Sequence, residues 1–257
     1  MSNKRAESEV LRLFRSFSRK GKEMYIFESI VRYSEASNNG KLDIGALVDY
    51  FQDCSTFQSE ALGVGIEHLR EKEIAWVLNS WQIVIEEYPK LGEKIKIGTK
   101  AYDFKGLYGY RNFCIMDEKN NMLVKANSLW VLINAKTGMP VKAPIEETDP
   151  YGKEEKIDME YADRKIKVEG EPEEREGFPV KKYHIDTNGH VNNAWYIKFA
   201  KEYLPDDFLV KTIRTEYKIA AKYGNKIYPV VYSNSDKQIV ALNNEMGKPF
   251  AIIEFTR

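Results

Sequence analysis

The chain has 257 residues and a mass of 29.8 kDa, and its 43% of hydrophobic residues exclude wholesale disorder and allow one large domain or two small ones. Basic and acidic residues number 39 each, so the formal net charge of +0 argues against a dedicated nucleic-acid binder. No apolar run approaches the roughly 18–20 residues that span a bilayer, so we expect a soluble protein with no membrane partner.

Residues 1–24 are expected to form a short N-terminal extension. Basic and apolar residues are interspersed there, but the uninterrupted apolar centre of a secretory signal is missing. Glu7 and Glu9 interrupt the basic pattern, which disfavours an organellar transit peptide. Cys54 and Cys114 form neither a disulfide framework nor a metal-binding motif, which favours a reducing compartment. We therefore expect a cytoplasmic protein.

The first half of the chain, residues 25–143, predicts one helix and a set of antiparallel strands. After Asp43, apolar residues recur at helical spacing up to Leu62, which places one apolar stripe of a helix against a core. Alternation of apolar and polar residues predicts the strands. These are expected at Tyr25–Tyr33, Ile74–Glu87, Lys94–Phe104, Tyr108–Met116 and Met122–Asn134.

Residues 144–177 have a different composition from the segments on either side. They hold 13 acidic residues against six basic ones and few large apolar side chains. This composition predicts an acidic linker, partly ordered against the core, and marks the one clear boundary in the chain.

Residues 178–257 repeat the element order of the first half. A helix opens after His190 and is stopped by Pro205, and Asp43 and Asp186 each precede the helix of their own half. The expected strands are Val180–Ile185, Leu209–Ala220, Lys226–Ser233, Gln238–Asn243 and Pro249–Thr256. Two copies of a helix-and-sheet unit, an α+β fold with two similar halves, are therefore predicted.

One stretch before the second helix carries the residues best suited to chemistry. Asp186, Asn188 and His190 stand at alternate positions, so a carboxylate, a carboxamide and an imidazole can line one wall of an extended segment. The helix start adds unpaired backbone N–H groups and a positive dipole end, which stabilise a developing oxyanion. The alternative is a polar turn that only caps the helix, with Asn192 or Asn193 as the cap.

This stretch closely resembles the D-x-N-x-H-V-N-N motif of the acyl-ACP thioesterases, enzymes that hydrolyse fatty acyl groups from acyl carrier protein. The similarity extends over nearly the whole chain from about Tyr25 onward. Other similar segments are Trp76-Val77-Leu78, Glu87-Tyr88-Pro89, Arg111-Asn112-Phe113, Ser128-Leu129-Trp130-Val131 and Glu216-Tyr217-Lys218. The resemblance implies a tandem (double) hotdog, each a long helix wrapped by a curved antiparallel sheet. It assigns the acyl-chain pocket to residues 25–143 and catalysis to residues 178–257.

The resemblance also implies roles for the motif residues in hydrolysing a thioester during fatty acid biosynthesis. Asp186 acts as general base toward water or as a nucleophile. Asn188 and the backbone N–H of Val191 bind the carbonyl oxygen, and His190 orients the water or protonates the leaving thiolate. The expected substrate-binding residues are Trp76, Trp81 and Trp195.

The chain departs from the plant members of the family at one position. Those members carry Glu-Cys where Ala220 and Ala221 stand here, so a thiol nucleophile is excluded at that site. Glu216 is the nearby carboxylate that can substitute in activating water, although strand alternation leaves its direction open.

The implied partner is acyl carrier protein with its phosphopantetheine-linked acyl chain. The basic residues expected to face this acidic partner are Lys198, Lys201, Lys211, Arg214, Lys218 and Lys222. No cofactor and no metal are expected, because the three histidines lack ligands at metal-binding spacing. Either a monomer or a homodimer is compatible with two fused hotdogs. An acyl-CoA thioesterase, a hotdog dehydratase and a non-catalytic acyl-carrier binding protein are the alternatives.

Overall fold

The computed structural model describes residues 24–257, so the extension expected at residues 1–24 lies outside the described residues except for Met24. The helices are α2 (Ile44–Ala61), α3 (Ile66–Glu71), α4 (Ile145–Thr148) and α5 (Asn193–Lys201), with the 3₁₀ turns η2 (Tyr33–Glu35), η3 (Asp149–Tyr151) and η4 (Lys182–His184). The strands are β1 (Tyr25–Ile30), β2 (Ile74–Ile85), β3 (Lys94–Lys105), β4 (Tyr108–Met116), β5 (Met122–Asn134), β6 (Pro172–Glu174), β7 (Phe178–Pro179), β8 (Thr212–Tyr217), β9 (Lys226–Ser233), β10 (Lys237–Asn243) and β11 (Pro249–Thr256). Within this described range, none of the helices is long and apolar enough to cross a membrane.

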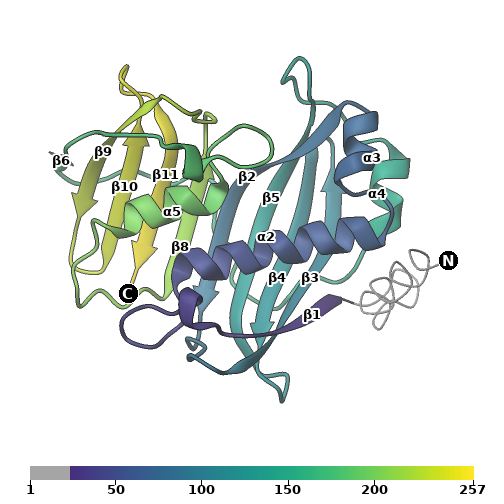
Figure 1. Ribbon diagram of the computed structural model, residues 1–257, viewed down its shortest axis with the longest axis horizontal. Helices are drawn as coiled ribbons and strands as arrows, with labels where there is room; N and C mark the ends of the chain where they lie inside the picture. The colour runs from purple at the N-terminus through teal and green to yellow at the C-terminus, as the bar shows by residue number, and fades with distance from the viewer. Residues whose placement is uncertain (1–23) are drawn as a thin grey trace.

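The strands form one antiparallel sheet in the order β1-β3-β4-β5-β2-β8-β11-β10-β9-β6, with β7 paired to β9. Strands of the first half occupy one end of this sheet and strands of the second half occupy the other (Figure 1). The halves join where β2 pairs with β8, from Ser80 opposite Glu216 to Val84 opposite Thr212. We call this pairing the seam.

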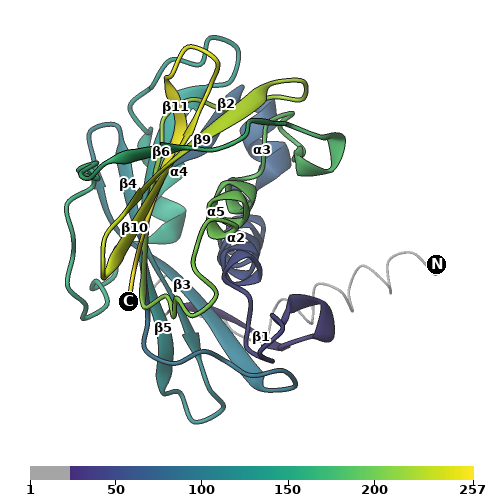
Figure 2. The same ribbon diagram turned by 90° about the vertical axis from the view of Figure 1, so that its left-hand side faces the viewer.

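The two longer helices, α2 and α5, lie on the same face of the sheet, as both views show (Figure 1, Figure 2). They run in opposite directions. The Lys201 ammonium at the end of α5 binds the Asp43 carboxylate at the start of α2. Gln52 of α2 donates to Oδ1 of Asn192, just before α5, at 3.2 Å. The largest fully buried side chains include Tyr196, Phe51, Phe113 and Phe255. Two helix-and-sheet units share one curved sheet, which confirms the expected α+β tandem hotdog.

Most of the expected elements are confirmed, with ends shifted by a few residues, and β4, β5, β9 and β11 have the expected bounds. The strand expected at Val180–Ile185 is wrong, because this segment forms η4. There the Lys181 N–H donates to Nδ1 of His184 at 3.0 Å, and the His184 N–H donates to the Lys181 carbonyl at 3.1 Å. The local turn takes the backbone groups that strand pairing would need. The short helix α3 was not expected, since six residues are too few for a clear period.

Residues 157–166 of the acidic linker lie on the sheet face opposite the helices, whereas Glu147 and Tyr151 in its first part contact α3 and α2. Side chains alternate along a strand, so Gln82 points away from α2, where its amide donates to the Glu160 carbonyl at 2.8 Å and accepts from the Ala162 N–H at 2.9 Å. On β8, the Glu216 carboxylate accepts a hydrogen bond from the Ile166 N–H. The linker is therefore tied to both strands of the seam.

Two aspartate–lysine pairs join α2 to α5, and only one of them also caps a helix. Asp43 accepts from the Gly45 N–H at 2.7 Å and binds Lys201, whereas Asp49 binds Lys198 at 2.8 Å and is more exposed. We predict that Asp43→Ala lowers the free energy of unfolding by about 1–3 kcal/mol. The matched control Asp49→Ala should cost less than about 1 kcal/mol. Urea denaturation measures both, and equal losses would contradict the assignment.

Asp43 also makes stability depend on pH. Burial by itself raises the pKa of this carboxyl, but the Lys201 ammonium and the Gly45 N–H outweigh burial and hold the pKa below its ordinary value of 3.8. A lowered pKa stabilises the folded state above that ordinary value, and the contribution is lost as the pH falls through the folded-state pKa. The difference in unfolding free energy between wild type and Asp43→Ala should therefore shrink on acidification from pH 5 to below pH 3.8.

Candidate active site

The three motif residues, Asp186, Asn188 and His190, lie in a tight turn between η4 and α5, which we call the motif turn (residues 186–190). The Asp186 N–H donates to the His190 carbonyl at 2.8 Å, and the Gly189 N–H donates to the Asp186 carbonyl at 3.1 Å. Gly189 has a φ of 75°, a left-handed conformation that favours glycine. Backbone hydrogen bonds and the conformation of Gly189 therefore define the turn without any contribution from side chains.

The Asp186 carboxylate is held by the turn. Its Oδ1 accepts from the Asn188 N–H at 2.8 Å and, more weakly, from the His190 N–H at 3.3 Å. Asp186 and His190 are half-buried, whereas Asn188 is exposed. Among residues 24–257, no hydrogen bond joins the side chain of one of the three to the side chain of another. The structure therefore gathers them on one turn without linking their side chains.

The start of α5 lies directly after this turn. Asn192 caps the helix through Oδ1, which accepts from the Ala194 N–H at 2.9 Å, so the capping alternative holds for this residue. The Val191 N–H donates to the Ala221 carbonyl at 2.9 Å. This backbone group, expected to bind the substrate carbonyl oxygen, is therefore already occupied. The N–H of Asn193 stands at the first helical position, where a backbone donor has no intrahelical partner.

The first half contains the same turn with different side chains. The Ser37 N–H donates to the Lys41 carbonyl at 2.8 Å, the Gly40 N–H donates to the Ser37 carbonyl at 2.9 Å, and Gly40 has a φ of 71°. Asp43 then caps α2 as Asn192 caps α5. Asp43 and Asp186 each precede the helix of their own half, as expected, but Ser37 rather than Asp43 occupies the turn position of Asp186. A carboxylate and an imidazole occur at these positions only in the second half.

The carboxylate of Glu216 faces away from α5. It accepts from the Ile166 N–H of the linker and binds Lys218 on the outer face of the sheet. Its neighbour Tyr217 points the other way, and its hydroxyl donates to the Asn193 carbonyl at 3.0 Å. Glu216 is thus separated from the motif turn by the sheet itself.

The three tryptophans expected to bind substrate lie in three different places. Trp81 is buried under α2 with its ring centroid 5.7 Å from that of Phe51. Trp76 packs on Phe104 at 6.1 Å, and Trp195 of α5 packs beside His184 at 4.7 Å. Only Trp81 lies between α2 and the sheet near the seam.

Four of the six basic residues expected to face a partner bind carboxylates of this chain. The pairs are Lys198–Asp49, Lys201–Asp43, Arg214–Glu254 and Lys218–Glu216. Other charged and aromatic side chains, not selected from the sequence, surround the motif turn instead. They are the exposed Lys181, Lys182, Tyr183 and Tyr223, next to the expected Lys222. Only the folded neighbourhood of residues 181–184 and 222–225 reveals them.

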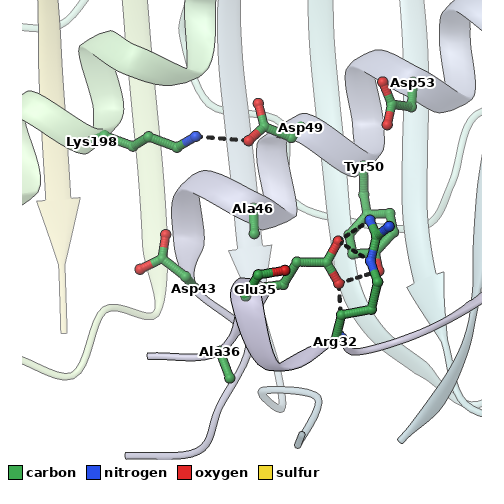
Figure 3. A pocket seen from close by; sticks show the side chains of 10 residues that line it. Arg32, Glu35, Ala36, Asp43, Ala46, Asp49, Tyr50, Asp53 and Lys198 are labelled. Carbon is green, nitrogen blue, oxygen red and sulfur yellow. Dashed lines mark hydrogen bonds and ion pairs between the residues drawn. The ribbon is translucent and has the colours of Figure 1, made fainter. Parts of the chain in front are cut away.

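A cavity of about 330 Å³ lies between η2 and α2 (Figure 3). Its charged groups largely pair with each other: Glu35 binds Arg32 and accepts from the Tyr50 hydroxyl at 2.7 Å. A second cavity of about 540 Å³ lies on the outer face beside the linker. Neither is lined by the three motif residues. Within residues 24–257, no group of three or more His, Cys, Asp or Glu side chains is placed to hold a metal ion.

His184 has a structural environment beside the motif turn. Its Nδ1 accepts from the Lys181 N–H at 3.0 Å, and its ring packs against Tyr183, Trp195 and Phe199. Burial, helped by the charge of Lys181, lowers the pKa of this imidazole from its ordinary value of 6.5. The neutral ring is therefore the form that the fold stabilises.

We predict that stability falls as the pH drops below about 6.5, because the unfolded chain then binds a proton that His184 in the fold resists. The variant His184→Asn keeps an acceptor for the Lys181 N–H but cannot titrate. Thermal unfolding between pH 5 and 8 should show a smaller pH dependence in this variant than in wild type. An unchanged dependence would assign the effect to other groups.

Comparison with known sequences matches most of the chain to one family. Residues 22–151 match the acyl-ACP thioesterase N-terminal domain, and residues 167–248 match the acyl-ACP thioesterase C-terminal domain. An acyl-[acyl-carrier-protein] hydrolase of Cuphea viscosissima is 29% identical over 147 residues, which are 54% of this chain and 35% of that protein. The match thus spans about a third of the length of this curated relative.

Comparison of structures gives the same fold. An acyl-ACP thioesterase from Bacteroides thetaiotaomicron superimposes with a TM-score of 0.81 at 22% identity, over 91% of this chain and 97% of that one. The 12:0-ACP thioesterase from Umbellularia californica superimposes with a TM-score of 0.78 at 18% identity, over 93% and 98% of the two chains. At these identities the likeness establishes the shared fold.

Proposed function

The chain belongs to the acyl-ACP thioesterase family, and we propose that it hydrolyses fatty acyl groups from acyl carrier protein to give a free fatty acid and the carrier thiol. The observation that carries this proposal is the motif turn, which holds a carboxylate, a carboxamide and an imidazole at the start of α5. The names of the curated relatives, which are acyl-carrier-protein hydrolases and thioesterases, support the same reaction.

Asp186 is the proposed general base. Its Oδ1 is occupied by the N–H groups of the turn, while Oδ2 receives no hydrogen bond from any residue in the range 24–257. Oδ2 takes a proton from water as the water oxygen attacks the thioester carbonyl carbon. The resulting tetrahedral intermediate then loses the thiolate, which takes a proton from His190. One C–O bond forms and one C–S bond breaks.

The carbonyl oxygen gains negative charge in this reaction and needs fixed donors. We assign them to the side-chain amide of Asn188 and the backbone N–H of Asn193, the first helical residue of α5. The Asn193 N–H takes the role expected for the Val191 N–H, which the Ala221 carbonyl already occupies. The positive end of the helix dipole supports the same charge.

The acyl chain is proposed to lie in the first hotdog, between α2 and the sheet. The side chains there are predominantly apolar and include Phe51, Trp81 and Phe113. Each methylene buried by the substrate contributes about 0.8 kcal/mol, so this region supplies most of the binding free energy of a long chain.

The motif residues provide the first test of this mechanism. We predict that Asn188→Ala lowers turnover about 10²–10³-fold by removing an oxyanion donor, and that Asp186→Ala lowers it about 10²–10⁴-fold by removing the base. Fatty acid released from acyl carrier protein is the measurement, with thermal unfolding checked for each variant.

Glu216→Gln is the matched control for these variants. Its amide oxygen still accepts from the Ile166 N–H on the outer face, so turnover should stay near the wild-type value. Full activity in Asn188→Ala would exclude the oxyanion assignment. A large loss of turnover in Glu216→Gln with normal stability would instead assign a catalytic role to the Glu216 carboxylate.

The carrier protein is proposed to dock beside the motif turn, on a surface formed by Lys181, Lys182, Tyr183, Lys222 and Tyr223, which we call the carrier surface. Tyr183 and Tyr223 are 63% and 60% exposed, and a lysine ammonium lies 5.9 Å from the centroid of each ring. The Val180 N–H donates to the Asn225 carbonyl at 2.8 Å, and this hydrogen bond holds the two loops of the surface together. Exposed aromatics among unpaired positive charges suit an acidic protein surface.

We predict that the double variant Lys182→Glu/Lys222→Glu lowers kcat/KM on acyl carrier protein about 10-fold or more at low salt. Added salt should narrow the difference in kcat/KM between wild type and this variant. The control Lys119→Glu, at the exposed β4–β5 turn, should change kcat/KM little. For hydrolysis of an acyl-pantetheine, a substrate that lacks the carrier protein, kcat/KM should be the same in both variants as in wild type. A loss on acyl-pantetheine as large as on the carrier would exclude the docking role.

The cytoplasm is the proposed compartment. Cys54 and Cys114 are buried free thiols, which suits a reducing environment. The Cuphea relative, in contrast, is named as chloroplastic.

A further inference from the structure

A row of polar side chains crosses the inner face of the sheet beneath α2. Thr215 on β8 stands opposite Trp81 on β2, Trp81 stands opposite Ser128 on β5, and Ser128 stands opposite Arg111 on β4. All four are at most 8% exposed. Directly opposite residues of antiparallel strands project to the same face with Cβ atoms roughly 4.5–5.5 Å apart. The four side chains therefore form one continuous row of polar groups across an otherwise apolar interior.

One end of this row is internally satisfied. The Arg111 guanidinium donates to Gln58 of α2 and to the Thr99 hydroxyl, the latter at 3.1 Å. The Ser128 hydroxyl donates to the Arg111 carbonyl at 3.1 Å and accepts from Nε1 of Trp130 at 2.8 Å. Because these groups bind each other, they maintain the fold and are not free to bind a ligand.

The other end of the row is not satisfied. Trp81 Nε1 and Thr215 Oγ1 are the two buried side-chain polar atoms in residues 24–257 that have no hydrogen-bond partner. They belong to residues that face each other across the seam and are 2% and 1% exposed. An unpaired buried donor costs about 1–3 kcal/mol. The residues that carry these two atoms are direct partners across the seam, which indicates a position where a ligand atom can bind.

This pair lies near the proposed site of hydrolysis. Tyr217 follows Thr215 on the same face of β8, about 7 Å along the strand, and its hydroxyl donates to the Asn193 carbonyl at the start of α5. Trp81 reaches the other way, into the interior under α2, where it packs on Phe51. Figure 1 shows β2 and β8 passing behind the place where α2 and α5 meet. On the proposed path from the start of α5 into the first hotdog, an acyl chain passes over β8 and β2, the strands that carry this pair.

We propose that Trp81 Nε1 and Thr215 Oγ1 together bind an oxygen atom carried by the acyl chain close to the thioester, so that the enzyme prefers 3-hydroxyacyl or 3-oxoacyl groups over plain saturated ones. This inference rests on the proposed thioesterase function. The indole N–H only donates and the threonine hydroxyl donates or accepts, so one hydroxyl or carbonyl oxygen satisfies both. A methylene at the same place leaves both groups unpaired.

The test compares matched carrier substrates of one chain length: 3-hydroxydodecanoyl, 3-oxododecanoyl and dodecanoyl. We expect wild type to show a kcat/KM at least about 10-fold higher on an oxygenated substrate than on dodecanoyl, as two hydrogen bonds allow. Trp81→Phe and Thr215→Val should each lower this ratio several-fold, while Trp130→Phe should leave the ratio unchanged. A wild-type ratio near one, or a ratio that survives both substitutions, overturns the proposal.

Ligand binding separates this inference from the proposed function. If no acyl carrier substrate is hydrolysed, the thioesterase proposal fails. The oxygen site is then judged by whether 3-hydroxydodecanoic acid raises the thermal midpoint more than dodecanoic acid in wild type, with the difference lost in Thr215→Val. No difference in wild type overturns the oxygen site as well.

Discussion

The pairing of β2 with β8 is the interaction on which the rest of the structure depends. It joins the strands of the two halves into one sheet, so that α2 and α5 cover the same face and the end of α5 meets the start of α2. That geometry brings Gln52 of the first half to the cap of α5 and places the motif turn beside the other half. The linker reinforces the same seam from behind through Gln82 and Glu216. A site between the halves therefore exists only because the sheet is continuous.

The interior of the first hotdog combines two physical requirements that usually exclude each other. The proposed binding of a fatty chain removes apolar area from water, which favours side chains such as Phe51 and Phe113 under α2. Buried polar atoms in such a place are costly unless paired. Arg111 and Ser128 are paired within the protein, while Trp81 and Thr215 are not. The contrast along one row separates groups that are satisfied within the fold from the two groups that we propose bind a ligand.

The fold was predictable where the pattern is local and strong, as in the strand at Met122–Asn134 and the helix after Asp43. The residues of the site could be predicted from the sequence, but their hydrogen-bond partners and the directions of their side chains could not. The occupation of the Val191 N–H depends on Ala221, 30 residues later in the chain, and the outward direction of Glu216 depends on its pairing register. The η4 turn escaped prediction because one His184 ring nitrogen competes with strand pairing for the Lys181 N–H. The periodicity of apolar residues along the sequence gives no information about such contacts.

Both halves form the same glycine turn before a capped helix, yet only the second carries an acid and an imidazole there. In an assembly of identical subunits every substitution would appear twice, and neither copy of the turn could change alone. Covalent fusion removes that restriction. Each copy can then carry side chains of its own, so Ser37 and Lys41 keep the turn in the first half while Asp186 and His190 stand at the same places in the second, and the molecule is asymmetric.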